Sequence, residues 1–195
     1  MIIRKDQLKL VPSTSTILNS PPEEYLFTNS EDAQFLANIL FERMKELGGV
    51  GLSANQVGVN ATVFVMGVNE VRLDIFNPKI IGESKEQLDF NEGCLSFPGI
   101  TLDIKRPVSI EVEYQNVKGE KITTFMTGIT ARIFQHEYDH MLGKTFKTHV
   151  SPMKWAMALK KFKNKKEKIV KKYTQKILVD ISKEIKNGDS DSNRV

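Results

Sequence analysis

Residues 135–140 constrain this chain more than any other stretch of its sequence. They read Gln-His-Glu-Tyr-Asp-His, so His136 and His140 lie four residues apart and Glu137 follows the first of them. Residues at i and i+4 share one face of an α-helix, and both imidazoles can therefore reach one metal ion. Glu137 then stands where a carboxylate can take a proton from a water molecule beside that metal. The segment predicts a helix with a metallohydrolase site, whose class depends on the third ligand.

The composition is typical of a globular protein with one substantial core. The chain has 195 residues, 40% of them hydrophobic and 27% charged. A chain of this length buries about 70% of the surface that it exposes when unfolded. Its longest apolar runs are too short to span a bilayer, so we expect no membrane association. With Cys94 as the one cysteine, no intrachain disulfide can form, and we expect a monomer in the reducing cytoplasm.

Periodicity and turn residues divide the first half of the chain. Residues 11–30 are rich in Pro, Ser, Thr and Asn and are expected to be irregular. A helix capped by Ser30 should follow and end at Gly48 and Gly49. Alternating apolar residues then predict several strands, of which the last two form a hairpin. These strands are expected at residues 61–68, 72–77, 102–105, 108–114 and 121–126.

Two helices are expected in the second half. The first should span residues 128–142, carry both histidines and end at Gly143. The second should begin at Pro152 and form a basic helix over residues 152–186, with twelve lysines against three acidic residues. That charge is either a solvated helix face or a contact with RNA phosphates. We expect residues 1–186 to form one catalytic domain and residues 187–195 to be a disordered polar tail.

The third ligand distinguishes the classes of metallohydrolase. A metzincin protease has a histidine six residues after His140, where this chain has Phe146. His149 lies three residues too far along the chain. A thermolysin-like protease would use a distant glutamate instead. Cys94 is the better candidate, because a thiolate is a strong metal ligand and Gly93 gives its loop backbone freedom.

Three separated segments resemble the three signature motifs of the peptide deformylase family. Residues 49–56, Gly-Val-Gly-Leu-Ser-Ala-Asn-Gln, resemble the first motif, with Ser53 where alanine is usual. Residues 92–96, Glu-Gly-Cys-Leu-Ser, match the second motif without a change. Residues 136–140 match the third, with Tyr138 where an aliphatic residue is commoner. Three motifs in the right order and spacing are far more specific than one.

The resemblance covers residues 47–150, whereas the first 30 residues fit the family pattern poorly and their role is left open. It implies an α+β fold in which antiparallel or mixed β-sheets wrap around the helix of the histidines. An N-terminal helix and the basic C-terminal helix complete that fold. The activity it implies is a metal-dependent hydrolase. This enzyme removes the N-formyl group from the formylmethionine of newly made polypeptides and releases formate.

The family chemistry assigns roles to the residues of the motifs. Cys94, His136 and His140 would bind the metal and leave a fourth position for water. Glu137 would remove a proton from that water, and the resulting hydroxide would attack the formyl carbon. Family members use Fe(II) natively, and Zn, Ni or Co are possible in the purified protein.

The resemblance also implies an oxyanion site and a peptide site. The side-chain amide of Gln56, the backbone N–H of Leu95 and the metal would hold the oxyanion of the intermediate. An apolar pocket would take the methionine side chain, although its residues could equally belong to the core. The residues expected to contact the substrate are Gly49, Val50, Gly51, Phe90, Ile129 and Ile133.

Arg106 lies in a Lys-Arg-Pro context twelve residues after the cysteine, which also fits the family. It is expected to pair with Glu92 and with Asp139, and so to orient the loop of the ligands. A plain surface position is as consistent with the sequence.

Partners follow from the same resemblance. The substrates would be N-formylmethionyl nascent peptides, and the basic C-terminal helix would either dock on the ribosome or only cover the core. Two other classes stay open: a peptidase that cuts internal amide bonds, and an RNA-binding protein with a structural metal. A structural site would need a fourth protein ligand, and none is obvious in the sequence.

Overall fold

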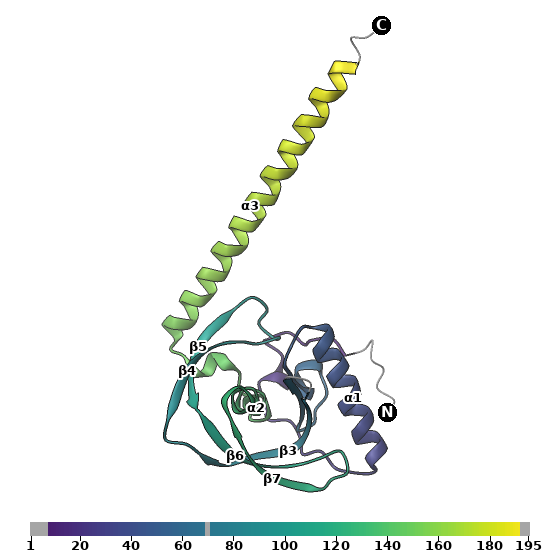
Figure 1. The fold of residues 1–195 in the computed structure, drawn as a ribbon, viewed down its shortest axis with the longest axis vertical. Helices are drawn as coiled ribbons and strands as arrows, with labels where there is room; N and C mark the ends of the chain where they lie inside the picture. Colours follow the sequence, from purple (N-terminus) through teal and green to yellow (C-terminus); the bar gives the residue numbers. More distant parts are fainter. Residues whose placement is uncertain (1–7, 69–70, 192–195) are drawn as a thin grey trace. The chain divides into compact units, whose positions relative to one another are not determined.

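A computed structural model of the protein describes residues 8–68 and 71–191, with the backbone alone for residues 68 and 177–191. The chain divides into two compact units, a body formed by residues 1–151 and a C-terminal unit formed by residues 152–195. Each unit is considered by itself (Figure 1).

The body contains two α-helices, three short 3-10 helices and seven strands among its described residues. The helices are α1 (Ser30–Glu46), α2 (Gly128–Met141), η2 (Thr16–Leu18), η3 (Ala54–Val57) and η4 (Phe146–His149). The strands are β1 (Gly51–Ser53), β2 (Val63–Val68), β3 (Val71–Glu83), β4 (Gln87–Gly93), β5 (Thr101–Pro107), β6 (Ser109–Gln115) and β7 (Lys121–Thr127).

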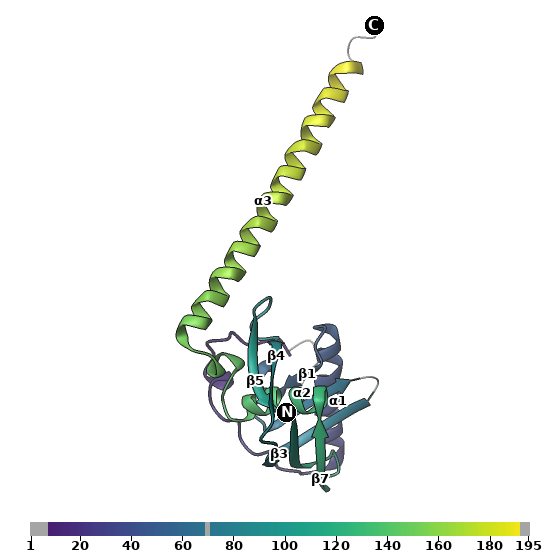
Figure 2. The same cartoon turned by 60° about the vertical axis from the view of Figure 1, so that its left-hand side comes forward.

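The strands form two separate sheets. A five-stranded sheet has the order β1-β2-β3-β6-β7, and β4 and β5 make a two-stranded ribbon. Every described pair of neighbouring strands is antiparallel. The two sheets surround α2, which is seen nearly end-on in Figure 1 and lies behind the ribbon in Figure 2. The predicted α+β fold, with sheets around a central helix that carries the histidines, is therefore confirmed.

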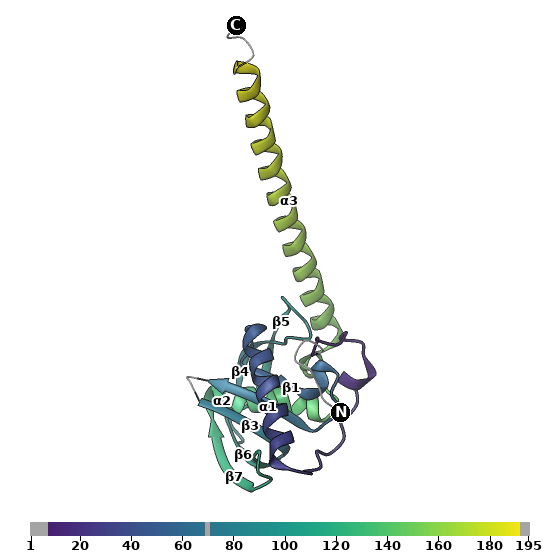
Figure 3. The ribbon, with the colours of Figure 1, turned by 90° about the vertical axis from the view of Figure 1, so that its right-hand side faces the viewer.

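Strand β2 shows how the sequence builds the core. Successive side chains of a strand point to opposite faces of its sheet. Val63 and Val65 belong to one buried cluster, together with residues of α1, which runs across that face of the sheet (Figure 3). Phe64 and Met66 belong to the other cluster, together with residues of α2. The five-stranded sheet is thus covered on both faces, by α1 on one and by α2 on the other. Packing against the sheet holds α2 in position.

The N-terminal helix begins one residue earlier than its predicted cap implied. Asn29 is the N-cap, and its side chain accepts a hydrogen bond of 2.7 Å from the backbone N–H of Asp32. Ser30 is therefore the first helical residue, and its assignment as the cap was wrong. Both residue types cap helices well, so the sequence alone did not separate them.

The end of α2 follows the prediction from Gly143. Its φ of +65° lies in the left-handed region, and Lys144 N–H donates to the carbonyl of Asp139 at 2.8 Å. A Cβ at this glycine would come within 2.5 Å of the backbone of Ser20. Gly143 therefore ends the helix and also permits close packing of the N-terminal segment.

The strands agree with the sequence only in part. The predicted hairpin is confirmed, because β6 pairs with β7 through the turn at residues 116–119. Strand β3 continues to Glu83, six residues beyond the predicted end at Asn77. Strand β4 was not predicted, since Asp89, Asn91 and Glu92 are poor strand formers. This ribbon strand carries residues of the site.

The C-terminal unit is one helix, α3 (Pro152–Asp191), which begins at Pro152 as predicted. It continues beyond residue 186, and residues 192–195 of the expected tail lie outside the described part of the chain. No helix in the described ranges is long and apolar enough to cross a membrane.

Candidate active site

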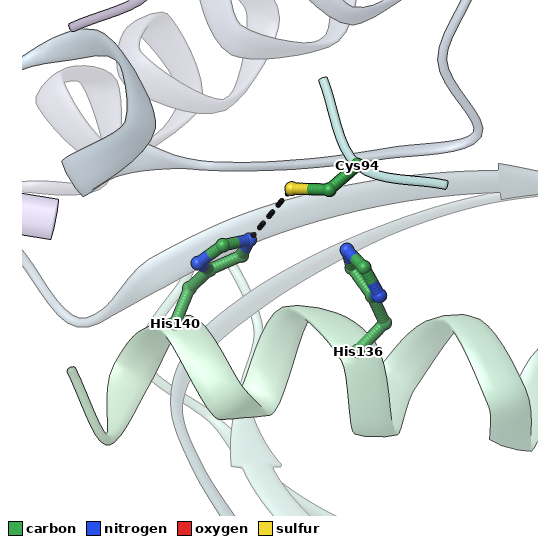
Figure 4. Close-up of side chains that lie close together, drawn as sticks. All are labelled: Cys94, His136 and His140. Carbon is green, nitrogen blue, oxygen red and sulfur yellow. Dashed lines mark hydrogen bonds between the residues drawn. The ribbon is translucent and has the colours of Figure 1, made fainter. Parts of the chain in front are cut away.

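Three donor atoms converge at the centre of the body. His136 and His140 project from one face of α2, and Cys94 approaches them from the turn after β4 (Figure 4). Their ligand atoms all lie within 4.8 Å of one another, and Cys94 Sγ is 3.5 Å from His140 Nε2. Zinc–nitrogen bonds are about 2.0–2.1 Å long and zinc–sulfur bonds about 2.3 Å. Ligand atoms that bind one ion are therefore separated from one another by distances comparable to those between these three atoms. The donor set therefore fits a transition metal ion.

Glu137 supplies an acid–base group next to these ligands. Its carboxylate is buried, and its Oε2 has no hydrogen-bond partner in the described protein. Burial raises the pKa of Glu137 to about 7, which suits exchange of a proton near neutral pH. An unpartnered buried carboxylate oxygen costs free energy, and such a group needs a partner or a role.

Glu92 orients one of the ligands. Its Oε2 lies 2.9 Å from His136 Nδ1, so the hydrogen bond through Nδ1 leaves Nε2 of the same ring for the metal. Arg106 donates to both carboxylate oxygens, at 2.7 and 3.1 Å, and Arg132 donates to Oε1 at 3.1 Å. Burial opposes ionisation of Glu92, but hydrogen bonds from His136 and Arg106 lower its pKa to about 2. The group is a carboxylate at neutral pH.

Asp139 joins the same cluster from the next turn of α2. Arg106 Nη2 donates to its Oδ2 at 2.8 Å, so Arg106 contacts both of the carboxylates that were expected to pair with it. His149, which the spacing excluded as a metal ligand, lies 2.7 Å from the same oxygen. Arg106 is buried, and the alternative of a plain surface position is wrong.

The turn η3 points the amide of Gln56 at the site. The N–H and hydroxyl of Ser53 donate to Gln56 Oε1 at 2.9 and 3.0 Å, which fixes the orientation of the amide. Its Nε2 then faces Cys94 Sγ at 3.6 Å and Ser96 Oγ at 3.1 Å. Ser53, the departure from the first motif, thus holds Gln56 in place. Leu95, which follows Cys94 in the sequence, is partly buried.

A cavity of about 610 Å³ leads to these groups. All six residues expected to contact substrate line it, as do Gln56, Cys94, Leu95, His136 and Glu137. Val50, Phe90 and Ile129 are about half exposed at its surface, whereas Ile133 is buried. An open apolar cavity with a few polar groups is the usual form of a small-molecule or peptide site.

Several residues of the site were missed in the sequence. Arg132 lies one turn before His136 on the same helix, and this spacing could have identified it. Besides Glu92, its guanidinium bonds the carbonyls of Leu88 at 2.6 Å and Ile104 at 3.1 Å. Asn55 precedes Gln56, and its amide donates to the carbonyl of His140 at 2.8 Å. It ties η3 to the C-terminal end of α2.

Comparisons with known proteins agree with this geometry. A family model described as polypeptide deformylase matches residues 7–156. The peptide deformylase of Thermotoga petrophila is 42% identical over 122 residues, which are 63% of this chain and 74% of that protein. The peptide deformylase of Wolbachia pipientis wMel is 34% identical over 174 residues, covering 79% of this chain and 95% of that one. The crystal structure of peptide deformylase from Thermotoga maritima has a TM-score of 0.71 at 34% identity, covering 75% of this chain and 99% of its own. The chain therefore belongs to the peptide deformylase family.

Proposed function

We propose that Cys94, His136 and His140 hold the metal with which this member of the family removes the formyl group from N-formylmethionyl peptides. One observation carries the proposal: the three donor atoms lie within 4.8 Å of one another beside the unpartnered carboxylate oxygen of Glu137. A divalent metal bound there supplies Lewis acidity, which polarises the formyl carbonyl and makes a water molecule more acidic.

The remaining chemistry falls to the side chains and backbone of the chain. Glu137 accepts a proton from the attacking water and passes it to the nitrogen of the methionine as the formyl C–N bond breaks. Gln56 Nε2 and the backbone N–H of Leu95 donate hydrogen bonds to the oxygen on which negative charge develops. The products are formate and a peptide with a free N-terminal amine.

The other cavity residues bind and orient the peptide. Phe90, Ile129 and Ile133 provide an apolar surface for the methionine side chain, and the loop at residues 49–51 follows the peptide backbone. Glu92 and Arg106 hold the imidazole of His136 in its orientation, and Asp139 holds Arg106. A substituted arginine would therefore act on catalysis through the histidine.

Substitution of Glu137 tests this assignment. Glu137→Gln keeps the shape of the side chain and removes the proton acceptor, and we expect formate release from formyl-Met-Ala-Ser to fall by about 10² to 10⁴. The metal content should stay near one ion per chain. Formate release at the wild-type rate by this variant would refute the role of Glu137, and cleavage of internal peptide bonds by the wild type would favour a peptidase.

The metal itself is proposed to be Fe(II), with Zn, Ni or Co as substitutes in purified protein. The sulfur and nitrogen donor set accepts all of these ions, so availability and preparation decide which is bound. Metal analysis after anaerobic purification tests the proposal, and Cys94→Ala should lose the metal. An unchanged metal content in that variant would refute the ligand set.

We also propose that α3 contacts ribosomal RNA near the emerging peptide. Twelve lysines lie at residues 152–186, and those described up to Lys176 are exposed. Lysines neutralise phosphates without reading a sequence. Replacing Lys165, Lys168 and Lys172 with Glu should slow deformylation of ribosome-bound chains and leave the rate on formyl-Met-Ala-Ser unchanged. An equal loss of rate on both substrates, relative to the wild type, would refute the contact with RNA.

The proposed setting is a monomer in the cytoplasm. A thiolate ligand and Fe(II) both resist oxidation better in a reducing compartment, and Cys94 is the one cysteine of the sequence. Fractionation of cells and light scattering of the purified protein test the two statements.

A further inference from the structure

The cavity has a second apolar wall that the proposed mechanism does not use. Its residues come from the N-terminal segment, the end of α1 and the loop that follows the cysteine. They are Leu10, Leu47, Leu95, Pro98 and Ile100. Of these, only Leu95 has a proposed role, and that role belongs to its backbone N–H. The side chains of this second wall have no assigned function.

Leu10 reaches the cavity from the segment whose role the sequence left open. Leu8 is 3% exposed in the core beside α1, Lys9 is exposed, and Leu10 is partly buried, which is the alternation of an extended chain. The next residue is held in place, because the backbone N–H of Val11 donates to the carbonyl of Gln56 at 2.9 Å. Leu10 is therefore fixed beside the turn that carries the amide of the site.

Leu10 and Leu95 also pack on the same buried cluster. Leu95 also lies close to Gly49, since a Cβ there would come within 2.8 Å of Leu95 Cδ1. Leu95, one residue of the second wall, thus has a defined position relative to the loop at residues 49–51, which borders the peptide site.

We propose that Leu10 is a specificity residue, which receives an apolar side chain at the second or third position of the formylated peptide. This inference rests on the proposed function. A peptide whose methionine occupies the wall of Phe90, Ile129 and Ile133 continues through the same cavity, whose volume of about 610 Å³ is typical of sites that enclose a ligand. An apolar side chain gains by leaving water at the second wall, whereas a polar one loses hydrogen bonds there.

Tripeptides with one varied position test the proposal. The peptides are formyl-Met-X-Ser and formyl-Met-Ala-X, with leucine or serine at X, and the measurement is kcat/KM for formate release. The wild type should prefer leucine by roughly tenfold at one of the two positions. Leu10→Ser should reduce that preference to about twofold and leave kcat on formyl-Met-Ala-Ser unchanged. We expect Leu10→Ser to raise KM for the preferred leucine peptide.

Two further variants separate specificity from folding. Leu8→Ala alters the same segment inside the core, so it should lower Tm and keep the leucine preference. Leu10→Phe keeps an apolar side chain and narrows the cavity, so it should reduce the preference for leucine even if Leu10→Ser folds poorly. An unchanged preference in both Leu10 variants, or equal losses on all four peptides, would overturn the proposal.

The outcome is also distinct from a failure of the proposed function. Wild-type protein that releases formate from all four peptides at equal rates would refute the second wall and leave deformylation intact. Wild-type protein that releases no formate from any of them would refute both.

Discussion

Gly51 gives a direct test of how closely Glu137 must be placed. Gly51 is the first residue of β1, and its φ lies outside the left-handed region, so alanine fits its backbone. A Cβ at this position would overlap Glu137 Oε1 and lie 2.9 Å from both Cγ and Cδ of the same side chain. We therefore expect Gly51→Ala to displace the carboxylate and leave the strand in place.

The size of the effect follows from this overlap. Ordinary van der Waals contact begins at 3.4 Å, so the carboxylate oxygen must move by about 1 Å. A misplacement of this size costs about 10²-fold in rate, or about 2.7 kcal/mol of activation free energy. We expect kcat for formyl-Met-Ala-Ser to fall by about that factor, with KM changed far less.

Gly67→Ala is a matched control on the neighbouring strand. Its Cβ would lie 2.9 Å from Phe41 Cε2, a steric overlap that involves no residue of the site. This variant should lower Tm and keep kcat, whereas Gly51→Ala should lower kcat and keep the metal. In a Glu137→Asp background the shorter side chain leaves room, so adding Gly51→Ala should cost much less than in the wild type. A kcat for Gly51→Ala within threefold of the wild type, in a folded and metal-loaded protein, would refute the argument.

Three further changes have defined outcomes. Arg132→Met removes one of the two arginine partners of Glu92 from a buried cluster and should lower the free energy of unfolding by about 3 kcal/mol, measured by urea denaturation. A loss below about 0.5 kcal/mol would show that Arg106 suffices. Asn55→Ala breaks the hydrogen bond to the carbonyl of His140 and should cost about 1 kcal/mol by the same method, with a Tm equal to the wild type as the contrary result. Removal of the metal with a chelator should abolish formate release and lower Tm, since an ion at 100 times its Kd stabilises the fold by about 2.7 kcal/mol, and an unchanged Tm would contradict binding by these ligands.

Local patterns were sufficient for much of the fold. The hairpin of β6 and β7 depends on alternation and on one turn, and α2 depends on one apolar stripe that ends at Gly143; both lie within a short stretch of sequence. Strand β4 depends on its pairing with β5, from Gln87 with Pro107 to Gly93 with Thr101. Its own residues favour a loop, so pairing with a strand on the far side of the turn at residues 94–100 determines its structure. That pairing was not accessible from local propensity.

The same distinction separates the predicted part of the site from the missed part. Cys94, His136 and His140 follow from ligand chemistry and short motifs, whereas Arg132 acquires its partners only when β4 and β5 pair beside α2. Its charge nevertheless contributes to the cluster, in which Asp139 also contacts His149. Arg106 Nη2 already divides its hydrogen bonds between Glu92 and Asp139, at 3.1 and 2.8 Å. One guanidinium cannot neutralise two buried carboxylates, and a buried charge without a counter-charge costs several kcal/mol. Arg132 supplies the second positive charge, and the ligand His136 is therefore oriented by a cluster whose carboxylates and arginines balance.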